Sequence, residues 1–249
     1  MHKLTILAST LALAAATSAP AATTVFDLGG ATAEATGFTY TVAGKQLQVS
    51  AASYAVAPQN FDQLSELTNG RTVRREAGGL GVNSGEGAGQ REQVDNDGTN
   101  EVLRLAVTGQ KTRLVSAKFN FVDDNDTLRV FGVNGTTMTL LGTAGTTGFT
   151  GEFFDNTAQD GPLSNGATVT ARTPGSLSNA TVFDVTFDQN LGRYDAFLFT
   201  VRNDAADGYR LQQLALAVPE PEAWALMLGG FGLVGNAMRR RSKTVVTYA

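Results

Sequence analysis

Alternation of apolar and polar side chains is the feature that most constrains how this chain folds. Residues 181–188 place Thr, Phe, Val and Phe on one side and Val, Asp, Thr and Asp on the other. Residues 114–121 repeat the pattern and end in Phe119 and Phe121 on one side. A period of two residues puts apolar side chains on one face of a strand, so both segments are predicted to be half-buried strands. Segment 194–201 is apolar on both sides apart from two residues, which predicts a central strand.

Eight further segments are strand candidates because they alternate or are rich in β-branched and aromatic residues: 24–28, 37–42, 46–56, 102–107, 127–133, 136–141, 167–171 and 210–217. Clusters of Gly, Asn, Asp and Ser separate them, and Asn134-Gly135 predicts a tight hairpin turn. The one passable helix signal covers residues 60–67. The pattern predicts an all-β, jelly-roll-like β-sandwich over residues 22–217, with an irregular β-solenoid-like stack as the alternative.

Composition narrows the chemistry open to this body. The chain has no Cys, and its single His is His2. The body therefore lacks the residues for Ser-His-Asp or Cys-His catalysis and for the usual His/Cys zinc site. Residues 22–217 carry 14 basic and 21 acidic side chains, a net charge of −7, which argues against nucleic acid as a partner. Carboxylate-based acid/base chemistry and oxygen-ligated calcium remain open, although we expect the protein not to be an enzyme.

The first 21 residues have the features of a secretory signal peptide. A weakly basic start at Met1-His2-Lys3 is followed by an apolar run over residues 4–16. Ala19 and Ala21 then supply small residues at the −3 and −1 positions of a cleavage site. This pattern predicts an N-terminal signal-peptide helix, passage through the Sec translocon and cleavage after Ala21. An uncleaved helical anchor is the alternative.

Two acidic clusters are candidate calcium sites. One contains Asp95, Asp97 and Glu101, with a Gly after the second aspartate that permits a sharp turn. The other contains Asp123, Asp124 and Asp126 between two predicted strands. Solvated turns explain the same residues, so both interpretations stay open for each cluster. The glycine-rich stretch 78–89 lacks the Lys-Ser/Thr ending and the strand–helix context of a phosphate loop, and is interpreted as a loop at the sheet edge.

The C-terminal segment 218–241 combines a proline turn, an apolar run and a basic end. Pro219, Glu220 and Pro221 come first, Trp224 and Ala225 open the apolar run, and Arg239, Arg240 and Arg241 close it. As a helix, residues 224–238 span about 22 Å, which is short against a hydrocarbon core of about 30 Å. Tryptophan at one end and arginines at the other nevertheless predict a transmembrane helix with its C-terminal end, and the tail 242–249, in the cytoplasm.

This C-terminal segment resembles the PEP-CTERM sorting signal of Gram-negative bacteria, in the variant in which Trp-Ala follows the second proline after two residues. The resemblance implies insertion in the inner membrane with the body in the periplasm, recognition of Pro219-Glu220-Pro221 by an exosortase, and processing nearby. The body is similar, more loosely, to exported PEP-CTERM proteins with an uncharacterised β-sandwich. The segments that carry this likeness are 79–82, 94–96, 101–105 and 122–126.

Together these observations predict an exported protein of the cell surface or extracellular matrix. We expect a structural or adhesive role in exopolysaccharide or biofilm. One alternative is a calcium-stabilised carbohydrate-binding module, although the body contains few tyrosines and no Trp. A second alternative is a carboxylate-dependent glycan hydrolase or lyase, which would need two carboxylates about 5–10 Å apart in a cleft.

Overall fold

A computed structural model describes residues 22–54, 63–85, 93–96, 98–122, 128–144, 168–171, 181–201, 208–218 and 221–240. The chain divides into two compact units, a body over residues 22–219 and a second unit that contains the C-terminal helix. The described part of the second unit is helix α1 (Pro221–Arg240).

The strands of the body are β1 (Ala22–Asp27), β2 (Ala33–Ala35), β3 (Gly37–Val42), β4 (Lys45–Tyr54), β5 (Leu67–Glu76), β6 (Gly79–Asn83), β7 (Val94–Asp95), β8 (Asn100–Val107), β9 (Arg113–Val122), β10 (Leu128–Asn134), β11 (Thr137–Ala144), β12 (Thr168–Ala171), β13 (Thr181–Thr186), β14 (Ala196–Thr200) and β15 (Gly208–Val218).

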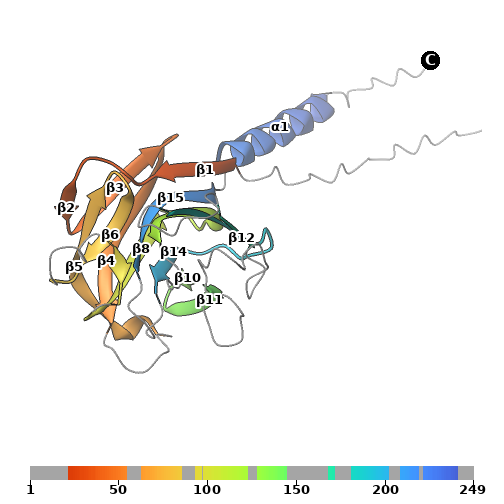
Figure 1. Cartoon of the computed structure of the whole chain (residues 1–249). Coiled ribbons are helices and arrows are strands. Elements are labelled where there is room, and N and C mark those ends of the chain that lie inside the picture. The colour runs from red at the N-terminus through yellow and green to blue at the C-terminus, as the bar shows by residue number, and fades with distance from the viewer. Residues whose placement is uncertain are drawn as a thin grey trace, which may run out of the picture. The chain divides into compact units, whose positions relative to one another are not determined.

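The fifteen described strands form one continuous antiparallel sheet (Figure 1). Its strand order is β11-β10-β14-β8-β4-β5-β6-β15-β9-β13-β12, and four further strands pair with its members: β1 and β7 with β15, β2 with β5, and β3 with β4. The first strand thus pairs with the last, which a stack of sequential solenoid repeats would not do. The prediction of an all-β body is confirmed.

Strand β5 joins two layers that would otherwise be separate sheets. Its first half pairs with β4, with Ala51 opposite Arg71, and its second half pairs with β6, with Thr72 opposite Asn83. The sheet then folds back on itself, because Phe119 of β9 and Phe199 of β14 lie 6.1 Å apart although five strands separate β9 from β14 along the sheet. The body is therefore layered as a sandwich is, but from a single sheet rather than from two.

The main hydrophobic core lies between these layers and combines residues from most strands. Phe26, Phe119, Phe199 and Tyr209 are among its largest fully buried side chains. A second apolar cluster covers the opposite face of the layer that contains β4, β8, β10 and β14: Ala52, Tyr54, Val102, Phe131, Val133, Ala196 and Leu198. Apolar burial on both faces explains why all five residues of β14 are buried, and confirms a central strand within 194–201.

The structure departs from the sequence-based expectations in the region 60–83. In the described part of the helix signal, residues 63–67, the structure has a 3₁₀ turn at Leu64–Glu66, and β5 follows it directly. Of the loop expected at 78–89, residues 79–83 form β6, in which Leu80 and Val82 are fully buried. The hairpin predicted at Asn134-Gly135 is confirmed, but its two-residue loop is Gly135-Thr136, because Asn134 still pairs with Thr137; Gly135 has a φ of 59°.

Candidate functional site

The C-terminal segment 218–241, which is predicted to be a sorting signal, begins where the last strand of the body ends. Strand β15 ends at Val218 and helix α1 starts at Pro221, a position that suits proline because its fixed φ matches the first helical turn. Pro219, Glu220 and Arg241 lie outside the described residues. Trp224, Ala225 and Arg240 lie within α1, for which the structure describes their backbone only. The structure thus contains a helix over the predicted residues 224–238, and α1 extends a few residues beyond them at both ends.

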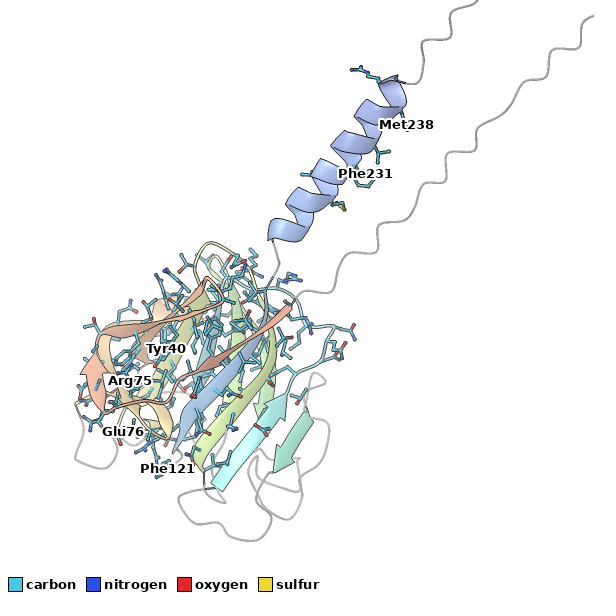
Figure 2. All side chains as sticks on the ribbon, turned by 90° about the horizontal axis from the view of Figure 1, so that it is seen from above. Tyr40, Arg75, Glu76, Phe121, Phe231 and Met238 are labelled. Atoms are coloured by element: carbon cyan, nitrogen blue, oxygen red, sulfur yellow. The ribbon has the colours of Figure 1, made fainter. Side chains whose placement is uncertain are left out.

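One side of α1 carries large exposed apolar side chains. Leu228, Phe231, Val234 and Met238 are each between 56% and 68% exposed. At 100° per residue these four positions fall within about a third of the helix circumference. Figure 2 shows Phe231 and Met238 projecting from the helix. Exposed apolar surface of this extent on a helix is typical of a segment that contacts a membrane or another helix.

The structure describes one of the two segments that were predicted to enter the membrane, the C-terminal helix, but not the N-terminal signal peptide. Among the described residues, no helix is long and apolar enough to cross a membrane, so the structure does not confirm the predicted transmembrane helix at 224–238. The predicted signal-peptide cleavage site at Ala19 and Ala21 lies outside the described residues, as does the tail 242–249. The described body starts one residue later, with β1 at Ala22.

The structure brings Asp95 and Glu101 together. Asp95 lies in β7 and is 3% exposed, while Glu101 lies in β8 and is fully buried. The backbone N–H of Asp95 donates a hydrogen bond to Glu101 Oε2 at 3.2 Å. Asp97, Asp123, Asp124 and Asp126 lie outside the described residues. Two of the three residues of the first acidic cluster are therefore buried strand residues rather than part of a solvated turn.

A polar network surrounds this carboxylate pair at one end of the sheet. Glu101 lies opposite Ser53 of β4, whose Oγ accepts a hydrogen bond from Arg71 Nε at 2.8 Å. On the neighbouring strand, Thr200 Oγ1 donates to the backbone oxygen of Glu101 at 2.6 Å. Tyr209 OH in turn donates to the backbone oxygen of Thr200 at 3.2 Å. The Arg71–Ser53 bond connects β5 with β4. The bonds of Thr200 and Tyr209 connect β8, β14 and β15, and this second set ties the two layers together.

Tyr54 borders the same end of the sheet from the second apolar cluster. Its hydroxyl donates to the backbone oxygen of Val201 at 3.4 Å. Burial raises the pKa of Tyr54, and the side chains of Thr200 and Arg129 partly oppose this shift. The phenol therefore stays neutral at physiological pH and acts as a hydrogen-bond donor within the body.

Calcium binding at Asp95 and Glu101 stays a prediction. Among the described residues, no three His, Cys, Asp or Glu side chains form a group that could hold a metal ion. If the two carboxylates share a calcium ion, EDTA will lower the melting temperature of the calcium-loaded protein, because a ligand bound only to the folded state stabilises it. A Glu101→Gln variant serves as the control, since chelation will then have a smaller effect. An unchanged wild-type melting temperature would eliminate calcium at this pair.

Sequence patterns did not indicate the cluster around Arg210. The guanidinium of Arg210 stacks 3.9 Å from the centroid of the Phe121 ring, and its Nη1 lies 3.8 Å from Glu76 Oε2. Phe121 adopts a left-handed φ of 57°, with its N–H bonded to Asn120 Oδ1 at 2.8 Å. Figure 2 labels Glu76 and Phe121, which lie at the same end of the body. These contacts join strands that are far apart in sequence, so the local alternation of apolar and polar residues cannot predict them.

Comparison with known proteins gives one match. No curated protein and no solved structure matches the chain. A protein-family model does match residues 217–242, which cover the proline turn, helix α1 and the arginine cluster. The resemblance inferred from the C-terminal residues is thereby confirmed for that segment, whereas the body keeps an uncharacterised fold. The chain carries a PEP-CTERM protein-sorting motif at residues 217–242.

Proposed function

We propose that this protein is an exported, non-catalytic component of the cell surface or extracellular matrix. The match of residues 217–242 to the PEP-CTERM protein-sorting motif is the observation that carries the proposal. Such a motif directs an exported protein to an exosortase. The body would then serve a structural or adhesive role among exopolysaccharides outside the cell.

The proposed route uses both ends of the chain. Residues 1–21 direct the chain through the Sec translocon, and α1 engages the inner membrane while an exosortase acts near Pro219-Glu220-Pro221. The exposed apolar side of α1, with Phe231 at its centre, supports contact with lipid or with a membrane enzyme. Arg239 and its two arginine neighbours support retention of the C-terminal end on the cytoplasmic side.

Two observations favour a structural body over a catalytic or glycan-binding one. Residues 22–217 contain no His or Cys, and the described carboxylates Asp95 and Glu101 are buried where a polymer could not reach them. Tyr54, Tyr194 and Tyr209 are also buried, so these rings fill the body rather than form a stacking surface for sugars.

Deletion of residues 219–241 will abolish delivery of the protein to the cell surface. The expected result is loss of surface signal in cell fractionation, with the body accumulating in the periplasm or in an unprocessed form. Deletion of residues 243–249 is the matched control, because it shortens the tail beyond the motif and will leave delivery unchanged. Surface delivery of the chain without 219–241 would refute the proposal.

A further inference from the structure

The sorting motif overlaps the folded body by two residues. The motif match begins at residue 217, whereas strand β15 continues to Val218. Ala217 is fully buried and Val218 is 1% exposed. The upstream end of the motif is therefore part of the sheet and not part of a linker.

Strand β1 holds this overlap from one side. Ala22 pairs with Val218 and Thr23 pairs with Ala217, so the first described strand of the body lies along the start of the motif. The 2.9 Å hydrogen bond from Leu28 N to Gln212 O extends the same ladder. In an antiparallel ladder, hydrogen-bonded and non-bonded pairs alternate. Even-numbered residues of β1 therefore exchange hydrogen bonds with β15, while the N–H groups of odd-numbered residues point to the open edge.

Strand β9 and its neighbours hold the other side. Ala217 lies opposite Arg113 of β9, and Arg193 Nη1 donates to the backbone oxygen of Ala217 at 3.4 Å. Among the described strands, β9 is itself flanked by β13, whereas β1 pairs with β15 alone. Val25 in the middle of β1 is 44% exposed. Although Phe26 of β1 is fully buried, release of β1 breaks one strand pairing, whereas release of β9 breaks its pairings with both β15 and β13. We therefore take β1 as the side that opens at lower cost.

We propose that β1 acts as a clasp: its pairing with β15 protects residues 213–218 from proteolysis and so determines where the chain can be cut near the sorting motif. Proteases bind substrates as extended strands through backbone hydrogen bonds, and a residue already paired on both sides cannot offer them. With β1 in place, processing leaves β15 whole, and the product keeps Ala217 and Val218. When β1 leaves, residues 213–218 lose one neighbour and become cleavable, which destroys the body. This proposal rests on the proposed function only in one respect, namely that the enzyme that cuts the chain near the motif is an exosortase.

Two proline variants test the clasp with nearly the same chemical change. Thr24→Pro removes an N–H that bonds to β15, whereas Val25→Pro removes one that points to the open edge. The purified full-length chain is treated with proteinase K, and the C-terminal end of the surviving body fragment is read by mass spectrometry. In wild type and Val25→Pro the fragment will retain Val218. In Thr24→Pro the end will move into 213–218, or cleavage there will become at least about tenfold faster.

A cross-link covers the case in which Thr24→Pro fails to fold. The chain has no cysteine, so Thr23→Cys combined with Ala217→Cys gives one defined disulfide between paired residues whose Cα atoms suit it. At a urea concentration at which the reduced form is cleaved within 213–218, the oxidised form will resist this cleavage at least about tenfold better. Equal cleavage of both forms at that urea concentration, or a wild-type fragment trimmed inside β15 without urea, would overturn the clasp. Neither readout involves an exosortase, so this failure is separate from failure of the localisation test.

Discussion

Replacing Phe119 by alanine will lower the free energy of unfolding by about 3–5 kcal/mol. The Phe119 side chain is fully buried between the two layers. Its ring makes an edge contact with Tyr209 at 5.0 Å and lies 6.1 Å from Phe199. Truncation removes the contacts that hold β9 against both β15 and β14, and leaves a cavity that rigid strands cannot fill.

Urea denaturation of the full chain, followed by circular dichroism, measures this loss. Val25→Ala is the control, since Val25 is 44% exposed on an edge strand and its truncation will change the free energy of unfolding by no more than about 0.5 kcal/mol. A loss below about 1 kcal/mol for Phe119→Ala would mean that the two layers do not meet at this ring.

Gly79→Ala will destabilise the body by about 3 kcal/mol or more, because two separate constraints act at this position. Gly79 has a φ of 127°, a conformation that L side chains rarely adopt. An added Cβ would also lie 2.6 Å from the backbone oxygen of Leu211 and 2.7 Å from its carbonyl carbon. Relief requires β6 to move away from β15, and β6 links β15 to β5, the strand that joins the two layers.

Gly44→Ala provides the matched control for this effect. Gly44 also has a positive φ, 74°, but no heavy atom lies within 4 Å of an added Cβ. Its substitution therefore carries only the conformational cost of about 1 kcal/mol. Thermal unfolding of both variants separates the two constraints. Equal losses would show that the close approach of Gly79 to Leu211 does not contribute.

Local pattern predicted most of the described strands but missed β2, β5, β6 and β7. Strand β3 was predicted at its observed bounds, and β9, β10 and β13 within two residues at each end. Strand β5 was missed because its sequence is largely polar and Val73 is its only buried residue. Strand β6 was missed because its glycines suggest a loop, whereas Gly79 is required there by the backbone of Leu211.

The two candidate sites, the sorting motif and the Asp95–Glu101 pair, also differ in how much of each could be predicted from the sequence. The sorting motif could be recognised from residues 218–241 because its proline turn, apolar run and arginines are contiguous in sequence. The pairing of Asp95 with Glu101 was anticipated from their spacing. Their burial was not, because β8, which carries Glu101, lies between β4 and β14 in the sheet, and both of these strands are far from it in sequence.

A strand-built body and a sorting motif after it follow from the amino-acid order alone, since both depend on residues that are close together in the chain. The single sheet folded on itself and the pairing of β1 with β15 are visible only in the folded protein. Residues 22 and 218 are almost two hundred positions apart, and no periodicity links them. Phe26 of β1 and Leu216 of β15 pack into a shared core to which most of the strands between them contribute, so their pairing depends on contacts far apart in sequence.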